Sequence, residues 1–135
     1  MKDYYICRYN MNATHSFSGR ESEHGHTFHI SVYVERKSCE DLENDTTDME
    51  IGSIDRLVES FLHQYEGRYL NDMEPFSENG ASVEDIGDFF YDQLAGLIDK
   101  TEFKLNRLDI AENPLFVYEV GDVAFHANNN REVIL

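Results

Sequence analysis

The sequence predicts an α+β domain in which a four-stranded antiparallel sheet carries two helices on one face. Two observations lead to this prediction. Pairs of segments rich in β-forming residues stand at both ends of the chain, and two stretches with apolar residues at helical spacing lie between them. The order of elements is therefore β-β-α-α-β-β. Because 135 residues is a common size for one domain, we expect residues 1–135 to form a single domain.

Four segments predict the strands because they are rich in β-branched and aromatic residues or alternate apolar with polar ones. They are residues 4–11, 26–36, 103–111 and 115–120. In the second segment, apolar residues at every other position predict one buried face, formed by Phe28, Ile30, Val32 and Val34. The polar residues 16–23 and the acidic residues 38–50 are expected to form loops.

Apolar residues at helical spacing predict the two helices. The buried face of the first is expected to hold Ile54, Leu57, Val58, Phe61, Leu62 and Tyr65. This helix should end near Gly67, a residue suited to a helix C-terminus. Ser82 can cap the second helix, with Asp85 three residues further on. Its apolar face is expected to hold Val83, Ile86, Phe89, Phe90, Leu94, Leu97 and Ile98.

The charge balance argues against several kinds of partner. The chain has 11 Lys and Arg against 27 Asp and Glu, a net charge of −16. Nucleic-acid binders and proteins that bind anionic membranes need clustered basic residues, so we expect neither partner. The first residues contain no long apolar run, and Cys7 and Cys39 fit no disulfide framework. A cytoplasmic protein with reduced thiols is therefore expected.

Four of the six histidines lie between residues 15 and 29. His24 and His26 are two apart at the start of a predicted strand, so their side chains should project from the same face. His15 lies across the hairpin loop at the end of the first strand, whereas His29 has the opposite parity. Three converging imidazoles suit zinc in a site with an open fourth position. The alternative is a solvent-exposed polar hairpin.

Several segments together resemble the 6-pyruvoyl-tetrahydropterin synthase and 6-carboxytetrahydropterin synthase family. They are MNATHSF, HGHTFHISVYVE, IDRLVESF, YLND, SVEDIG and LDIAEN, in this order along nearly the whole chain. The resemblance implies the tunnelling fold (T-fold) and zinc ligands at His15, His24 and His26. It also implies that subunits join edge to edge into a barrel, with two trimers stacked into a homo-hexamer.

The resemblance implies a pterin as the small-molecule substrate and assigns two further residues. Glu112 matches the family glutamate that anchors the pterin, and a carboxylate can accept two hydrogen bonds from the guanidine-like edge of that ring. Glu84 matches the glutamate at the start of the second helix. Its carboxylate either contacts the ligand or only favours the helix dipole, and both interpretations stay open.

The chain departs from the family at its catalytic positions. Family enzymes place a cysteine four or six residues before His-Gly-His, where this chain has Arg20 and Ser18. The family's Asp-His pair is replaced by Glu66 and Gly67. Glu21, three residues before His24, resembles the glutamate of a branch that uses it in place of the cysteine. The alternative for Glu21 is an ordinary carboxylate in a loop of an acidic protein.

The resemblance therefore implies a zinc-dependent carbon–carbon or carbon–oxygen lyase. Its expected substrate is dihydroneopterin triphosphate or a related dihydropterin of a folate- or queuosine-type pathway, with Glu21 as the proton-transferring group. The alternative is a non-catalytic or repurposed family member that binds a pterin or purine. Gly67, in the place of the activating histidine, favours that alternative.

Overall fold

The structure, a computed structural model, describes residues 4–16, 23–37 and 47–122, with only the backbone of residues 47–50. The strands are β1 (Tyr5–His15), β2 (His24–Arg36), β3 (Phe103–Asn113) and β4 (Phe116–Gly121). The helices are α1 (Thr47–His63), the short 3-10 helix η2 (Leu70–Asp72), α2 (Phe76–Asn79) and α3 (Val83–Ile98). No helix in this part of the chain has the length and apolar character needed to cross a membrane.

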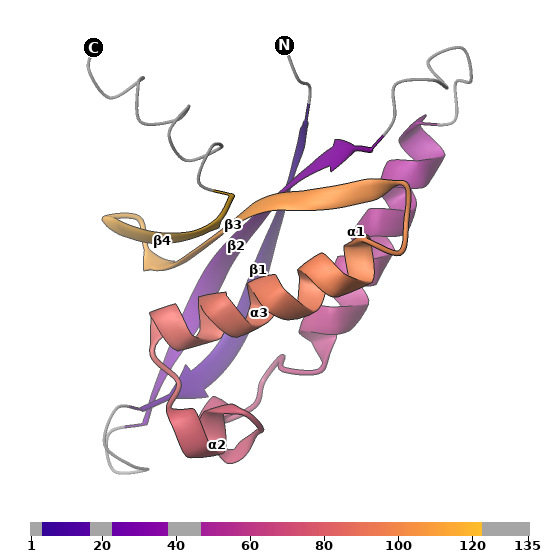
Figure 1. Cartoon of the computed structure of the whole chain (residues 1–135). Helices are drawn as coiled ribbons and strands as arrows, with labels where there is room; N and C mark the ends of the chain where they lie inside the picture. Colours follow the sequence, from indigo (N-terminus) through magenta and orange to yellow (C-terminus); the bar gives the residue numbers. More distant parts are fainter. Residues whose placement is uncertain (1–3, 17–22, 38–46, 123–135) are drawn as a thin grey trace.

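The four strands form one antiparallel sheet in the order β1-β2-β3-β4. The long helices α1 and α3 both lie across the same face of this sheet, and among the described residues no helix covers the opposite face (Figure 1). This arrangement confirms the predicted α+β fold and its order of long elements.

The predicted apolar faces meet between the helices and the sheet. The β2 side chains Phe28, Ile30, Val32 and Val34 are all buried there. From α1, Ile54, Val58, Phe61, Leu62 and Tyr65 are buried, and from α3, Ile86, Phe90, Leu94 and Ile98 are buried. Aromatic rings interlock at the centre, where the Phe61 ring meets the Phe90 ring at a centroid distance of 5.3 Å. Burial of these side chains supplies most of the driving force for folding.

Several boundaries differ from the sequence prediction; β1, for example, continues to His15 instead of ending at residue 11. Helix α1 begins at Thr47, inside the acidic segment expected to be a loop. Acidic residues are favourable near a helix N-terminus, so the charge of that segment does not exclude a first helical turn. The helix ends at His63, and turns continue to Gly67, which has a φ of 73° that favours glycine. The connection to the next long helix contains η2 and α2 in addition to the expected loop.

The predicted capping box at the start of α3 is confirmed. The Ser82 side chain accepts a hydrogen bond from the Asp85 amide at 3.0 Å, and the Asp85 carboxylate accepts one from the Ser82 amide at 3.2 Å. These bonds satisfy amides at the helix N-terminus that would otherwise lack partners. They also hold the backbone of Ala81, which precedes the cap, at the end of the sheet.

Helix α3 contains two glycines in different surroundings, and they make a matched pair. A Cβ atom at Gly87 would lie 2.9 Å from the Ile110 side chain and 2.9 Å from the Tyr118 ring, whereas one at Gly96 would meet no atom within 4 Å. Overpacking costs about 1–3 kcal/mol, and alanine gains about 1 kcal/mol over glycine in a helix. We therefore expect Gly87→Ala to lower the free energy of unfolding by about 1 kcal/mol and Gly96→Ala to raise it by about 0.5–1 kcal/mol.

Urea unfolding of the two variants at equal protein concentration measures this difference. Equal stabilisation by both substitutions would show that α3 does not approach the sheet at Gly87 as closely as the structure has it.

Candidate metal centre

The three predicted metal ligands meet at one end of the sheet. His15, the last residue of β1, pairs directly with His24, the first residue of β2. His26 follows two residues later and projects from the same face. The ring centroids are 4.5 Å apart for His15 and His24, 5.2 Å for His15 and His26, and 4.6 Å for His24 and His26. The alternative of an exposed polar hairpin does not hold for His15, which is fully buried.

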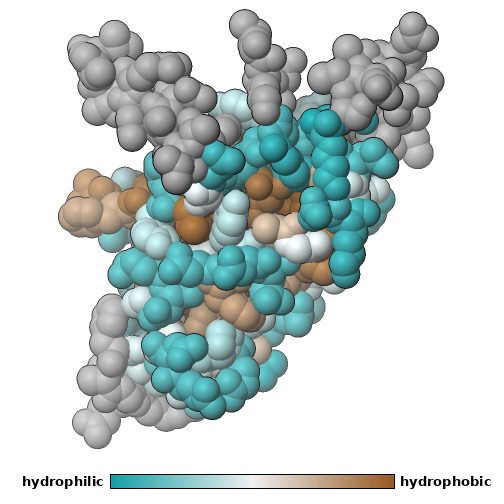
Figure 2. All heavy atoms as spheres, in the orientation of Figure 1, coloured by the Kyte–Doolittle hydropathy of each residue, from teal (hydrophilic) through white to brown (hydrophobic). Residues whose placement is uncertain are grey.

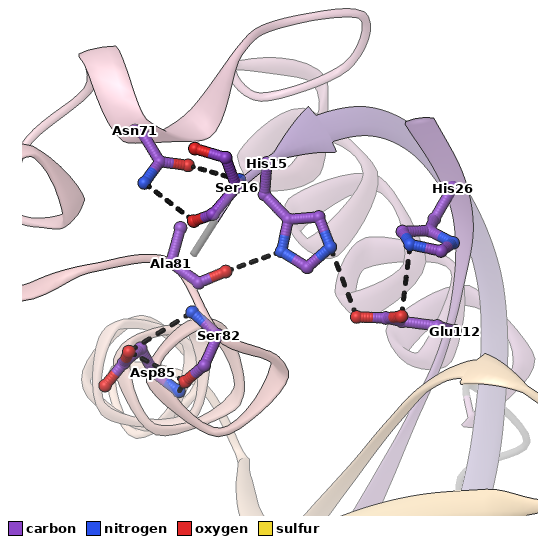
Figure 3. A network of polar contacts seen from close by, with 8 residues as sticks. All are labelled: His15, Ser16, His26, Asn71, Ala81, Ser82, Asp85 and Glu112. Atoms are coloured by element: carbon purple, nitrogen blue, oxygen red, sulfur yellow. Dashed lines mark hydrogen bonds and ion pairs between the residues drawn. The ribbon is translucent and has the colours of Figure 1, made fainter. Parts of the chain in front are cut away.

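A carboxylate from β3 completes this cluster. Glu112 Oε1 lies 3.2 Å from His15 Nε2, and Glu112 Oε2 lies 3.1 Å from His26 Nε2 (Figure 3). One ligand atom from each of His15, His24, His26 and Glu112 lies within 4.8 Å of the others. The sequence placed Glu112 in the substrate site alone, and the structure places its carboxylate among the imidazoles.

The surroundings of His15 and His26 favour imidazoles that can bind a cation. His15 Nδ1 lies 2.6 Å from the Ala81 carbonyl oxygen. A carbonyl only accepts, so Nδ1 carries the proton and Nε2 faces Glu112. Burial is the largest cause that lowers the pKa of His26; the Glu112 charge opposes it, and His15 and His24 lower it further. The neutral imidazole is the form that binds metal ions.

The residues therefore fit a bound zinc ion. His26 Nε2 is buried and makes no hydrogen bond within the described part of the chain, and a cation at this point would satisfy it. Imidazole nitrogens and a carboxylate oxygen are ligands that zinc prefers. His15, His24 and His26 would hold the ion, and Glu112 lies close enough to join them.

Two residues that the sequence analysis did not assign a role hold the end of β1. The Asn71 side chain accepts a hydrogen bond from the Ser16 amide at 2.9 Å and donates one to the Ser16 carbonyl oxygen at 3.1 Å (Figure 3). The hydroxyls of Ser16 and Tyr69 lie 2.6 Å apart. These contacts fix the backbone next to His15. The only signal in the sequence was the family-like YLND segment that contains both residues.

Glu112 also lines a hollow next to the cluster. This hollow has a volume of about 360 Å³, and its lining includes Glu84, Glu112, Phe116 and Tyr118. Both predicted substrate-binding carboxylates therefore lie on one hollow beside the candidate metal centre. The Tyr118 hydroxyl donates to Asp88 at 2.7 Å, and this bond raises the pKa of Tyr118 to about 12. The hollow thus combines two carboxylates with aromatic walls.

Among the described residues, the other candidates from the sequence do not join the cluster. Glu21 is outside the described residues. The carboxylate of Glu23 accepts a hydrogen bond from the Thr14 hydroxyl at 2.8 Å, so it is directed away from His24. In place of the family's Asp-His pair, Glu66 accepts from the Asn12 amide and the Gly67 amide donates to the Asn12 carbonyl oxygen, both at 2.6 Å. These two residues cover the edge of β1.

Comparison with known proteins agrees with the fold. The sequence matches the family described as 6-pyruvoyl tetrahydropterin synthase over residues 5–122, and the chain belongs to that family. The structure is similar to that of 6-pyruvoyl tetrahydropterin synthase from Caenorhabditis elegans, with a TM-score of 0.66 and 16% identity. The match covers 89% of this chain and 95% of the other, which confirms the T-fold. No curated protein matches the sequence.

The cluster predicts the metal content of the protein. We expect about one zinc per chain, with imidazole nitrogens at roughly 2.0–2.1 Å from the ion. The double variant His24→Ala, His26→Ala should lose the zinc, since it removes two of the three imidazoles. Elemental analysis after dialysis measures this loss. Unchanged zinc in the double variant would place the metal elsewhere. His63→Ala, on α1, is the control and should retain it.

Proposed function

We propose that this protein is a zinc-dependent lyase that binds a dihydropterin in the hollow beside Glu112 and cleaves its side chain. The observation that supports this proposal is the position of Glu112, which borders both the three-histidine cluster and the hollow. The proposed substrate is dihydroneopterin triphosphate or a related dihydropterin. Membership of the family supports the pterin.

Glu112 would recognise the pterin ring. The pterin edge presents an N–H and an amino group side by side, and a carboxylate accepts from both in a bidentate pair. Phe116 and Tyr118 line the same hollow and offer apolar contacts to the flat ring. Glu84 is exposed in the first turn of α3 and also lines the hollow, where it can accept a further hydrogen bond from the ligand.

Proton transfer would fall to Glu21, which replaces the family's cysteine in the loop before His24. In a retro-aldol cleavage its carboxylate takes the proton from a side-chain hydroxyl as the adjacent carbon–carbon bond breaks. It then returns the proton to the carbon that keeps the bonding electrons. Bound zinc would supply Lewis acidity toward the oxygens of the substrate side chain.

One observation favours a second function, a family member that binds a pterin or purine without cleaving it. Glu66 and Gly67 stand where the family has its Asp-His pair, and both hydrogen-bond to the backbone of Asn12. They cannot activate a thiol. Turnover of dihydroneopterin triphosphate, detected as a new fluorescent pterin after oxidation, would reject the binding-only function.

Glu112→Gln tests the recognition of the ring. The amide places an N–H₂ group where one acceptor oxygen should be and removes the charge. Loss of one charge-assisted hydrogen bond costs about 1.5–3 kcal/mol, which is roughly a 10- to 150-fold loss of pterin affinity. A fluorescence titration with pterin measures the affinity. Glu78→Gln, at an exposed position on α2, is the charge-matched control. Equal affinities of the two variants would show that Glu112 does not bind the ring.

Glu21→Gln tests the proton transfer. We expect zinc and pterin binding to stay nearly unchanged while turnover falls about 10²-fold or more, the usual contribution of a positioned acid–base group. Glu23→Gln is the matched control, because that carboxylate is bonded to Thr14 and should leave turnover within a few-fold of the native chain. Steady-state kinetics on dihydroneopterin triphosphate compares the two. Normal turnover in Glu21→Gln would refute the replacement of cysteine by glutamate.

We also propose a hexamer of two trimers, built by pairing of sheet edges. The amides of Asn12 and Thr14 point away from β2, at the edge of the sheet, and donate to residues 66–68, which cover this part of the β1 edge. By alternation the amides of Ile6, Arg8 and Asn10 point the same way, and β1 is an outer strand of the sheet. An uncovered edge invites a further strand.

The opposite edge carries apolar side chains. At the turn into β4, Leu115, Phe116 and Val117 are 82%, 77% and 51% exposed. They project from the molecule where Figure 2 shows an apolar extension on the left, next to β4 of Figure 1. A neighbouring subunit that pairs with β4 would bury this surface.

Sedimentation at micromolar concentration tests the assembly. We expect a hexamer, or at least a trimer, for the native chain. Arg8→Pro removes one outward amide of β1, which an edge strand tolerates, and should yield a folded smaller species. A monomeric native chain, or an Arg8→Pro variant that assembles fully, would contradict edge pairing through β1.

A further inference from the structure

Glu112 belongs to two sites at once. Its carboxylate lies against His15 and His26 in the metal cluster, and the same residue lines the hollow proposed to receive the pterin. It reaches this position from β3, where it lies two residues after the buried Ile110 and on the same face of the sheet. The two sites therefore share one side chain.

The contacts in the cluster suit a cation between the carboxylate and the imidazoles. Because His15 Nδ1 donates to the Ala81 carbonyl oxygen, Nε2 of the neutral ring carries a lone pair, and this atom lies 3.2 Å from Glu112 Oε1. Glu112 Oε2 lies 3.1 Å from His26 Nε2, a buried atom that makes no hydrogen bond within the described part of the chain. A ring nitrogen and a carboxylate oxygen repel at such distances when no proton or cation lies between them. A metal ion among them turns both contacts into ligand bonds.

We propose that Glu112 exchanges between two partners: its carboxylate is the fourth ligand of the metal in the empty protein, and it leaves the metal to bind the pterin edge. This exchange rests on the proposed function. Three imidazoles and a carboxylate close a four-coordinate site, whereas a catalytic site keeps one position open. Pterin binding would open that position.

The exchange follows from the number of oxygens available. A bidentate pair with the pterin needs both carboxylate oxygens. In the cluster, both oxygens lie against imidazole nitrogens. Glu112 therefore cannot bind the metal and form the bidentate pair with the pterin ring at the same time. Withdrawal of the carboxylate also removes one negative charge from the metal. Recognition of the ring would thus expose a more electrophilic metal only when a substrate is present.

The first measurement tests the metal half and needs no pterin. Zinc affinity is measured by competition with a chromophoric chelator for the native chain, Glu112→Gln and Glu84→Gln. Glu84→Gln removes a charge from the same hollow without touching the cluster. We expect at least tenfold weaker zinc binding for Glu112→Gln, since loss of even an indirect partner of a metal site costs about 10- to 100-fold. If Glu112→Gln binds zinc as tightly as Glu84→Gln does, the role of Glu112 as a metal ligand is overturned.

The second measurement tests the exchange on the native chain, so it does not depend on the folding of a variant. Binding of unsubstituted pterin, which has no side chain to reach the metal, is followed by fluorescence with and without zinc. We expect pterin to bind the zinc-loaded protein at least about fivefold more weakly than the zinc-free protein, because the carboxylate must first leave the ion. By reciprocity, saturating pterin should weaken zinc binding by the same factor. In Glu112→Gln the dependence on zinc should vanish.

The outcomes separate the two proposals. Pterin that binds equally well with and without zinc would overturn the exchange and leave the proposed function standing. Pterin that binds in neither state would overturn the proposed function and the exchange together. The ligand role of Glu112 would then still be decided by the zinc affinities.

Discussion

The register between β1 and β2 is the constraint on which the site depends. It sets His15 directly opposite His24 and places His26 beside them on the same face. A shift by one residue would turn every side chain of one strand to the other face. It would carry His15 away from the other imidazoles and expose Met11 and Ala13, which are buried in the core. The pairing that buries the core therefore also assembles the candidate metal centre.

The other elements hold this end of the sheet in place. The capping box of α3 positions Ala81, whose carbonyl oxygen selects the protonated nitrogen of His15. Asn71 binds the backbone of Ser16 from the other side. β3 brings Glu112 to the same point through its pairing with β2. A candidate metal centre supported on several rigid elements would need little rearrangement to bind an ion.

Much of this arrangement is local in the sequence and could be predicted from it. Alternation on β2, helical spacing in α1 and α3, and the Ser82–Asp85 capping box each depend on residues a few positions apart. The convergence of His15, His24 and His26 follows from one hairpin, which also makes it predictable.

What could not be predicted depends on residues far apart in the chain. Glu112 reaches the imidazoles only because β3 pairs with β2 in one particular register, which includes an irregularity between Tyr33 and Val34. The start of α1 at Thr47 lies in an acidic segment with no apolar periodicity to mark it. The role of Asn71 depends on Ser16, which is 55 positions away.

A metal among the imidazoles is the central claim, and it also explains how an acidic chain keeps a carboxylate against two ring nitrogens. X-ray diffraction from zinc-loaded crystals at the zinc absorption edge tests it most directly. The account predicts one strong anomalous peak per chain, bounded by His15, His24 and His26, with Glu112 bound to it while the hollow is empty. Anomalous peaks only at surface carboxylates, with none inside the cluster, would contradict it.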